Sequence, residues 1–172
     1  MQRPTKSRVT AAAMTMIGLS FVWAQRAMAA CTDPARPGVD WNRCYHDGRN
    51  LGEVDLTGAK LRGARFNRAD LQNSTLDQAD GRRTKFVSAM LKGVRFEGAN
   101  LTEADFTKAD LTGASFKGAN LRSARLFRAV LRGADLTGAR LQAADLLKAD
   151  LSGARWTDGE TVCAEGSISQ CK

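Results

Sequence analysis

The chain has 172 residues, enough for one domain, with 26 lysine or arginine and 18 aspartate or glutamate residues and a formal net charge of +8. It contains no nucleophile elbow, no phosphate-binding loop and no cluster of metal ligands, and His46 is its single histidine. These observations argue against an enzyme, and they predict no catalytic residue, no metal and no cofactor.

Residues 1–29 have the layout of a secretory signal peptide. Arg3, Lys6 and Arg8 precede the apolar stretch 9–24, and Ala27-Met28-Ala29 supplies the small residues that signal peptidase requires. We therefore expect cleavage after Ala29 and a periplasmic or secreted protein. Removal of this segment would leave 22 basic and 18 acidic residues, a net charge of +4.

Two other interpretations of the N-terminus stay open. An uncleaved membrane anchor is disfavoured because the apolar run 9–24 is short, whereas a membrane span needs about 20 residues. A lipoprotein with a lipidated Cys31 is disfavoured by the neighbouring Arg26 and by the odd thiol that lipidation would leave. With the leader removed, we expect no transmembrane segment.

The four cysteines flank the central region of the chain. In an exported protein an even number indicates disulfides, and sequence proximity favours Cys31–Cys44 and Cys163–Cys171. We expect segments 30–48 and 159–172 to form terminal caps, each held by one disulfide. His46 lies in the first of these segments and is expected to be a cap residue rather than a general base.

A five-residue repeat occupies residues 49–158. Every fifth residue from Leu51 to Trp156 is leucine, phenylalanine or tryptophan, except Gly81, and the residue two positions earlier is alanine at 17 of the 22 sites. A period of five would spread the large residues around a helix and alternate them across a strand. Only a chain that bends once in every repeat points them all inward. The pattern therefore predicts a square coil in which four repeats make one turn.

Segments such as Ala99-Asn100-Leu101, Ala109-Asp110-Leu111 and Ala134-Asp135-Leu136 resemble the A(D/N)LXX signature of the pentapeptide-repeat family. The resemblance implies an all-β fold, a right-handed quadrilateral β-helix or repeat solenoid. The 22 repeats would then give about five and a half coils, with disulfide-stapled caps at both ends. The family implies no single function.

Two details of the repeat can be interpreted in this fold. Glycine recurs at intervals of one or two whole coils, which predicts that two of the four sides bend at a residue with positive φ. These glycines are Gly58, Gly98, Gly118 and Gly138, and Gly93, Gly113, Gly133 and Gly153. Gly81 leaves an interior position without a side chain. Phe86 could fill the space, the corner 80–85 could distort, or the space could hold a ligand.

The outward residues divide unequally among the four sides, which we name by their first interior residue: Leu51 (first), Leu56 (second), Leu61 (third) and Phe66 (fourth). The first and second sides each carry a net charge of −2, the third +4 and the fourth +5. On the fourth side, the column Arg65, Lys85, Asp105, Arg125 and Asp145 alternates in sign over its last four members, which predicts pairing between coils. The column Arg68, Ser88, Lys108, Arg128 and Lys148 does not alternate.

Val87, Phe127 and Leu147 occupy an outward column between these two. Cations beside exposed apolar groups predict a surface for an anionic, partly apolar partner. The candidate binding residues are therefore Arg65, Arg68, Lys85, Lys108, Arg125, Phe127, Arg128, Leu147 and Lys148. A column of this kind can also arise by chance on a lattice with many outward positions.

The sequence therefore predicts a non-enzymatic scaffold or interaction protein of the bacterial cell envelope that binds an acidic polymer, lipid or protein through its two basic sides. Some pentapeptide-repeat proteins mimic DNA and protect type II topoisomerases. That alternative is disfavoured by the basic charge and the predicted leader. Direct binding of nucleic acid is physically feasible but conflicts with export. End-to-end pairing of two chains as a homodimer stays open.

Overall fold

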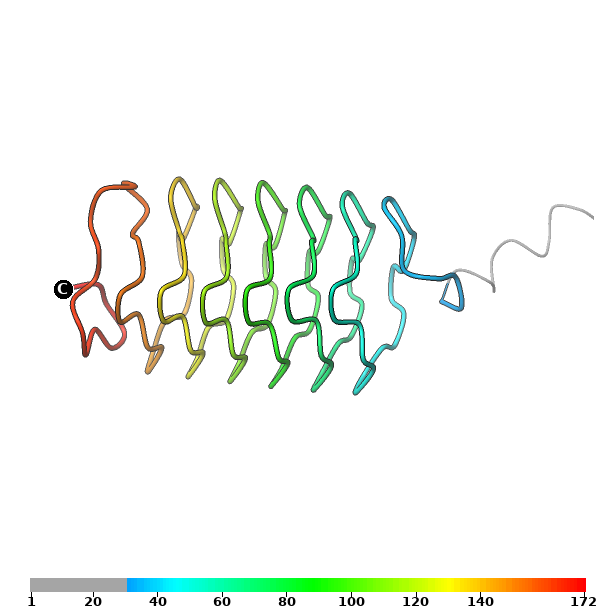
Figure 1. Ribbon diagram of the computed structural model, residues 1–172, viewed down its shortest axis with the longest axis horizontal. Coiled ribbons are helices and arrows are strands. Elements are labelled where there is room, and N and C mark those ends of the chain that lie inside the picture. Colours follow the sequence, from blue (N-terminus) through cyan, green and yellow to red (C-terminus); the bar gives the residue numbers. More distant parts are fainter. Residues whose placement is uncertain (1–30) are drawn as a thin grey trace, which may run out of the picture.

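The computed structural model describes residues 31–172, so the predicted signal peptide lies outside the described residues. The chain winds as a stack of similar coils along one axis (Figure 1). Residues 31–172 contain no helix, and their β-structure consists of isolated bridges at single residues. Within that range, no helical segment is long and apolar enough to cross a membrane.

Each turn of the coil consists of four repeats, as predicted. From Asp40↔Lys60 to Asp135↔Arg155, parallel bridges join each residue that precedes an interior position to the one four repeats further on, without a change of register. In each repeat the amide of the interior residue donates to the next coil, as in Leu51 N–H to the Asp70 carbonyl at 2.7 Å. The residue before it donates to the previous coil, as in Asp70 N–H to the Arg49 carbonyl at 2.9 Å. Each repeat therefore forms one side of a coil and is hydrogen-bonded to the coils before and after it.

The remaining amides explain the choice of Asp or Asn before the interior residue. The interior residue begins a β-turn, closed by the bond from Ala59 N–H to the Leu56 carbonyl at 3.0 Å. The first outward residue of the turn donates its amide to the preceding carboxylate, as Thr57 does to Asp55 Oδ1 at 2.9 Å. A short acceptor side chain at this position therefore satisfies an amide that the turn leaves unpaired.

The second outward residue of each turn, which we call the bend residue, has a positive φ. As predicted, glycine holds this position in most repeats of the first and second sides. On the fourth side the bend residues from Arg68 to Lys148 are all non-glycine, with φ between 56° and 61°.

The interior residues form a continuous buried core. Phe66, Phe86 and Phe106 stack on the fourth side with ring centroids 5.3 and 5.0 Å apart, and Phe96 and Phe116 stack on the second at 5.2 Å. All five phenylalanines are fully buried. Burial of each such side chain contributes about 1.5–3 kcal/mol, so the repeated interior position is the main source of stability.

The regular coil begins before the boundary at residue 49 that the repeat indicated. Trp41 and His46 are in phase with Leu51, point into the core and are 0% and 1% exposed. Bridges from Asp40 and Tyr45 continue the same register. Segment 30–48 is therefore not a separate cap over its whole length, and His46 is an interior residue rather than a cap residue.

The space beside Gly81 is filled by the next coil. A Cβ atom at Gly81 would lie 2.9 Å from Cδ2 of Leu101, which is one coil further on the same side. The corner is not distorted, because Gly81 N–H still donates to the Asn100 carbonyl at 2.8 Å and Asp80 and Lys85 keep their bridges. Leu101, rather than Phe86, occupies the position.

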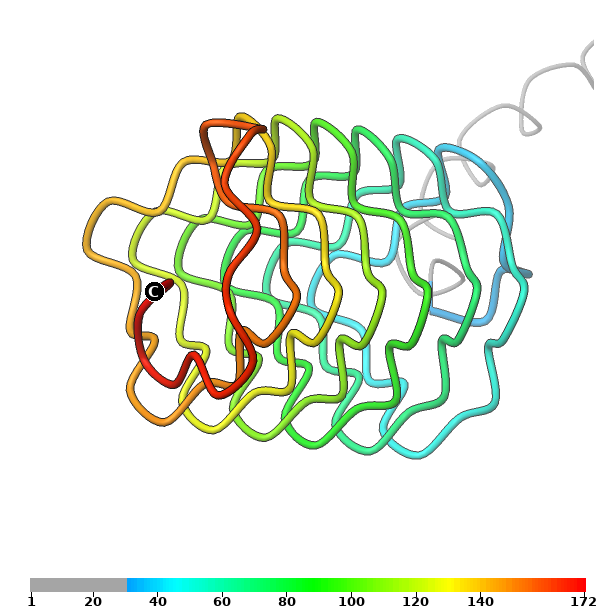
Figure 2. The ribbon, with the colours of Figure 1, turned by 60° about the vertical axis from the view of Figure 1, so that its left-hand side comes forward.

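The two disulfides join the pairs that sequence proximity favoured, Cys31–Cys44 and Cys163–Cys171. The C-terminal tail folds against the last coil through antiparallel bridges from Ile168 to Asp150 and from Val162 to Arg155. It covers part of that end (Figure 2). Leu151 is buried under it, whereas Leu141 and Leu146 stay half-buried.

Candidate anion-binding groove

Ion pairs on the first and second sides follow one geometric rule. The first outward residue of one turn pairs with the residue that precedes the interior position on the adjacent coil. The pairs are Asp77–Arg95 at 2.6 Å, Lys92–Asp110 at 3.4 Å, Lys117–Asp135 at 3.4 Å and Arg132–Asp150 at 2.6 Å. Most cations of these two sides are thereby compensated.

The fourth side follows this rule once and then departs from it. Arg65 pairs with Asp47 at 2.6 Å. One coil further, Asn67 stands where Asp47 stood, so Lys85 has no carboxylate within ion-pair distance among residues 31–172. The neutral residues Val87, Thr107, Phe127 and Leu147 continue the Asn67 column.

The predicted pairing along the column from Lys85 to Asp145 occurs at a single contact. Arg125 Nη1 lies 3.9 Å from Asp105 Oδ2, and no other ion pair joins neighbours of this column within the described chain. The prediction of an alternating ladder is therefore wrong in most of its length. The physical reason is that most ion pairs between coils join the first outward residue of one turn to the residue before the interior position of the adjacent coil, and on this side the first outward residues after Asp47 are all neutral.

The bend residues of the fourth side form a row of cations without carboxylate partners. In the described part of the chain, no ion pair is formed by Arg68, Lys108, Arg128 or Lys148. The last three lie one coil apart, about 4.8 Å, where like charges repel. We call these four residues the cation column.

The apolar residues beside the cation column are less exposed than predicted, except for one. The Arg128 guanidinium lies over the Phe127 ring, 5.2 Å from its centroid, and Phe127 is half-buried. Val87 is also half-buried. Leu147 is 55% exposed. The predicted exposure of Phe127 is therefore wrong in degree, because Arg128 covers the ring.

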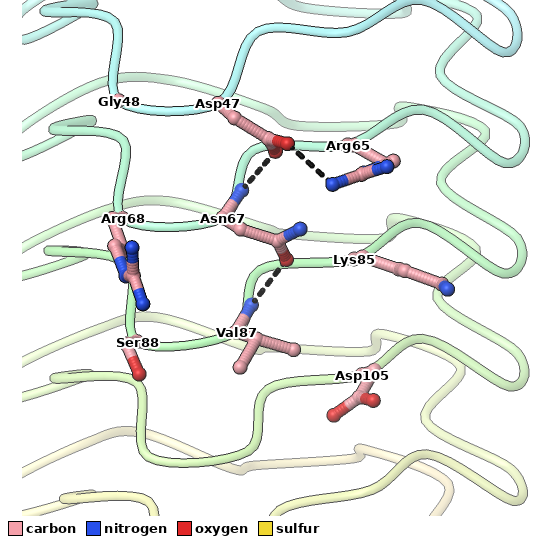
Figure 3. Close-up of a pocket in the computed structure, with 9 residues that line it drawn as sticks. All are labelled: Asp47, Gly48, Arg65, Asn67, Arg68, Lys85, Val87, Ser88 and Asp105. Atoms are coloured by element: carbon pink, nitrogen blue, oxygen red, sulfur yellow. Dashed lines mark hydrogen bonds and ion pairs between the residues drawn. The ribbon is translucent and has the colours of Figure 1, made fainter.

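A groove of about 600 Å³ lies at the N-terminal half of the fourth side. Its lining residues come from successive coils (Figure 3) and are Asp47, Gly48, Arg65, Asn67, Arg68, Lys85, Val87, Ser88 and Asp105. It brings together three of the predicted binding residues, Arg65, Arg68 and Lys85. The other six, from Lys108 to Lys148, lie further along the side and do not line it.

The floor of the groove is held by hydrogen bonds between coils. Asn67 N–H donates to Asp47 Oδ1 at 2.8 Å, and Val87 N–H donates to Asn67 Oδ1 at 3.2 Å. In Figure 3 these residues lie between Arg68 and Ser88 on one wall and Arg65, Lys85 and Asp105 on the other. Because the floor residues have short side chains, the walls stand above them and leave the hollow.

One wall is further fixed by Arg65. Its guanidinium lies 5.0 Å from the centroid of the Tyr45 ring, and it pairs with Asp47. Its Nε is buried without a hydrogen-bond partner in the described structure. Arg65 therefore has a fixed orientation and a compensated charge, whereas Arg68 and Lys85 carry the uncompensated positive charge of the groove.

His46 lies inside the coil behind the groove. Its ring stacks on Phe66 at 5.1 Å and contacts Trp41 at 4.2 Å, and Nδ1 lies 2.8 Å from Arg49 Nη1. Burial, and after it the charge of Arg49, lowers the pKa of His46 to about 4, while Asp47 acts in the opposite direction. His46 is therefore neutral at pH 7 and buried away from solvent.

Sequence reasoning did not single out four of the groove residues, Asp47, Gly48, Asn67 and Ser88. Asp47 and Gly48 fell in the segment expected to be a cap, and Asn67 and Ser88 are ordinary outward residues of the repeat. The available signal was the phase of Trp41 and His46, which extends the five-residue period back past Arg49. Within residues 31–172, no three His, Cys, Asp or Glu side chains are placed to hold a metal ion.

Sequence comparisons identify the family. The family model described as "Pentapeptide repeat region" matches residues 49–126, and the one described as "Pentapeptide repeats (8 copies)" matches residues 119–155. The chain belongs to the pentapeptide-repeat family, whose members are right-handed quadrilateral β-helices. A comparison with curated proteins finds no match.

Several solved structures are similar. One is HetL, a pentapeptide repeat protein involved in heterocyst differentiation regulation in the cyanobacterium Nostoc sp. strain PCC 7120. It is 28% identical in sequence, and the match covers 73% of this chain and 62% of HetL with a TM-score of 0.42. A pentapeptide repeat protein of the Arabidopsis thaliana thylakoid lumen is 29% identical, with 73% and 85% covered and a TM-score of 0.43. QnrB1, a plasmid-mediated fluoroquinolone resistance protein, is 20% identical, with 69% and 65% covered and a TM-score of 0.30.

Proposed function

We propose that this protein is a non-enzymatic scaffold of the cell envelope, periplasmic or secreted, that binds an acidic partner through its third and fourth sides. The observation that carries the proposal is the cation column of the fourth side, Arg68, Lys108, Arg128 and Lys148. These cations lack carboxylate partners in the described chain, although most cations on the first and second sides have them.

Two energetic penalties accompany the cation column. Its residues adopt positive φ, which costs a residue with a Cβ roughly 1 kcal/mol relative to glycine. Three of them also repel one another across successive coils. Neither feature stabilises the coil, so an anionic partner that neutralises the column offers a reason for both.

DNA mimicry is the second function suggested by the family, and the surface supports it less well. A DNA-like surface needs rows of uncompensated carboxylates. On the first and second sides, Asp77, Asp110, Asp135 and Asp150 each pair with an arginine or lysine. Their negative charge is largely cancelled within the protein.

The proposal is tested with Lys108→Glu combined with Arg128→Glu. Glutamate is compatible with this backbone, because Glu53 and Glu103 occupy bend positions with φ of 60° and 59°. We expect the double variant to elute from immobilised heparin at clearly lower salt than the wild type, and to lose binding to phosphatidylglycerol vesicles. Unchanged retention on both would contradict the proposal.

A matched control separates the cation column from the rest of the basic surface. Arg122→Glu with Arg140→Glu changes the charge by the same amount on the third side, at exposed residues without an ion pair in the described structure. We expect a smaller effect from this control. Equal effects would show that retention does not depend on the cation column in particular. Detection of the cleaved protein in a periplasmic or secreted fraction tests the envelope assignment separately.

A further inference from the structure

We propose that the groove on the fourth side binds an acidic sugar unit, a ring with hydroxyl groups that carries a carboxylate or phosphate. This inference rests on the proposed function, since it names the class of ligand that one part of the basic surface takes. It concerns only the N-terminal half of the fourth side. Lys108, Arg128 and Lys148, the other three residues of the cation column, lie outside the groove.

The donors of the groove suit one anionic group. Arg68 and Lys85 have no carboxylate partner in the described structure, and they stand on opposite walls. Asn67 uses its carbonyl oxygen to accept from Val87 N–H, which leaves its amide NH₂ group available. The Ser88 hydroxyl lies on the Arg68 wall. A guanidinium, an ammonium, an amide and a hydroxyl therefore surround the same hollow, and an anion accepts from all four types of donor.

The ends of the groove are electrically different from its middle. At one end Asp47 compensates Arg65 at 2.6 Å, and at the other Asp105 lies 3.9 Å from Arg125. The positive potential is therefore concentrated at Arg68 and Lys85. Carboxylate oxygens at the two ends can accept hydrogen bonds from ligand hydroxyl groups, which a simple inorganic anion lacks.

The size and floor of the groove favour a sugar over other anions. A volume of about 600 Å³ lies within the usual range for small-molecule sites, and it exceeds what one phosphate requires. Val87 is the single lining residue with a hydrocarbon side chain, and it offers a small apolar surface for one face of a sugar ring. Among the described residues, no aromatic side chain lines the groove for stacking of a nucleobase, and Val87 alone offers too little apolar surface for an acyl chain.

A charge-neutral substitution blocks the groove without changing the cations. Val87→Phe places at Val87 the side chain that Phe127 already has in the same column two coils further on. We therefore expect the position to accept phenylalanine in this coil. Gln72→Phe introduces the same side chain at the equivalent turn position on the first side and serves as the matched control.

A second variant changes the chemistry of the groove while conserving its hydrogen bonds. Asn67→Asp keeps an Oδ1 acceptor for Val87 N–H, as Asp47 already provides for Asn67 N–H. It removes the amide donor and gives Lys85 the carboxylate partner that Arg65 has in Asp47. The groove then loses its uncompensated ammonium.

The measurement is titration calorimetry with trigalacturonate, its neutral galactose counterpart, glucose 6-phosphate and inorganic phosphate. We expect the acidic sugars to bind and the neutral trisaccharide not to bind. The stronger of trigalacturonate and glucose 6-phosphate identifies carboxylate or phosphate as the preferred group. Val87→Phe and Asn67→Asp should each weaken that binding at least about ten-fold, and Gln72→Phe less than about two-fold.

Several outcomes overturn the inference. Equal binding of the neutral trisaccharide, equal binding of inorganic phosphate and sugar phosphate, or unchanged binding by both groove variants would each do so. The broader proposal fails separately. Suppose that Lys108→Glu with Arg128→Glu leaves retention on heparin and vesicles unchanged while the groove still binds acidic sugars. The proposal of an extended basic binding surface is then wrong, and the proposal of a sugar site in the groove is retained. If the groove variants bind normally while the double variant loses retention, the groove is wrong.

Discussion

The first and second sides of the coil differ from the third and fourth in how closely they follow the repeat. On the first two, most bend residues are glycine; acidic side chains pair with cations on the adjacent coil on these sides and also on the third, as in Arg62–Asp80 and Arg83–Glu103. On the other two, the bend residues are mostly Arg, Lys, Ser, Glu or Ala, and the fourth side carries the cation column. The interior departures, Gly81 and His46, also lie there.

The difference separates residues that build the coil from residues that the coil carries. A coil needs an apolar interior residue and a bend that tolerates positive φ, and the first two sides supply both most regularly. The third and fourth sides keep the same backbone bonds and register despite their departures. Their variation therefore affects the surface and local stability, not the fold.

The largest pH-dependent effect is expected at His46 on the fourth side. The unfolded chain binds a proton at this residue below about pH 6.5, whereas the folded chain does so only below about pH 4. Between these values the unfolded state binds more protons, so acid lowers the free energy of unfolding. The contribution present at pH 7 is about 3 kcal/mol, lost progressively as the pH falls from about 6.5 to 4.

Denaturant unfolding across this pH range measures the effect, and His46→Phe provides the reference. Phenylalanine continues the aromatic column of Phe66 and Phe86 and cannot titrate. The difference in free energy of unfolding between wild type and variant should therefore depend on pH in this window. A constant difference would mean that His46 is not held neutral by burial. The carboxylates contribute equally to both proteins and cancel.

A smaller effect is expected at Gly81 on the third side. Gly81→Leu restores the repeat in the sequence, yet it should destabilise the protein by about 1–3 kcal/mol because Leu101 already fills the space. Thermal and denaturant unfolding measure the loss. A stabilising Gly81→Leu would show that a cavity, not Leu101, occupies this position.

The double variant Gly81→Leu with Leu101→Gly moves the leucine one coil back. Leu101→Gly alone should cost at least about 2–5 kcal/mol, the range for truncating a buried leucine to alanine, since it removes a buried side chain. We expect the double variant to be more stable than the sum of the single losses predicts, because each change makes room for the other. Strict additivity would contradict direct contact between the two positions.

The sequence predicted the coil, its register of four repeats, the glycine bends and both disulfide pairs, because each depends on residues close together or on a strict period. It did not predict where the coil starts. Trp41 and His46 replace the usual Leu or Phe, and Arg49 stands where alanine is usual, so the period is hard to see there. Asp47 and Gly48 belong to this first coil, and the groove was missed with them.

The sequence also did not predict the conformations of the charged side chains. The sequence placed Phe127 and Arg128 side by side, but only the structure shows the guanidinium covering the ring. It also placed Asp105 and Asp145 between cations, but their oxygens accept from the turns that follow them. A repeat assigns each residue to a column. It does not decide which of several neighbours a flexible charged side chain contacts.

Two aspartates allow a direct comparison of the first and fourth sides. On the first side, Asp150 accepts from Ser152 N–H at 3.1 Å and Ser152 Oγ–H at 2.6 Å, and it pairs with Arg132 at 2.6 Å. On the fourth side, Asp145 accepts from Leu147 N–H alone among the described contacts. Asp150→Ala should therefore cost about 2 kcal/mol and Asp145→Ala about 1 kcal/mol or less, as measured by denaturant unfolding.

The pKa of Asp150 gives a second check on this pair. Burial raises that pKa, but the hydrogen bonds from Ser152 and Arg132 outweigh burial and hold it below its usual value. The stabilisation by Asp150 is therefore present above about pH 4 and is lost as the pH falls through the folded pKa. Equal losses of stability for the two alanine variants at neutral pH would mean that neither the Arg132 ion pair nor the Ser152 hydroxyl bond adds stability.

The smallest effect tests whether the positive φ of the bend residues on the fourth side lowers the stability of the protein. Lys108 and Gly113 occupy the same bend position in consecutive repeats, with φ of 59° and 66°. Lys108→Gly should raise the free energy of unfolding by about 1 kcal/mol, since it removes the strain that positive φ imposes on a residue with a Cβ and the repulsion between Lys108 and Arg128. Gly113→Lys should lower the free energy of unfolding by a similar amount. Nothing lies within 4 Å of a Cβ added there, so the experiment measures backbone strain and not a steric contact.

If both changes leave the free energy of unfolding unchanged, the bend does not favour glycine and the lysine carries no cost. If Lys108→Gly is stabilising and also weakens retention on heparin, the fourth side gives up stability for binding, which is the relation expected of a functional surface and not of a chance column of charges.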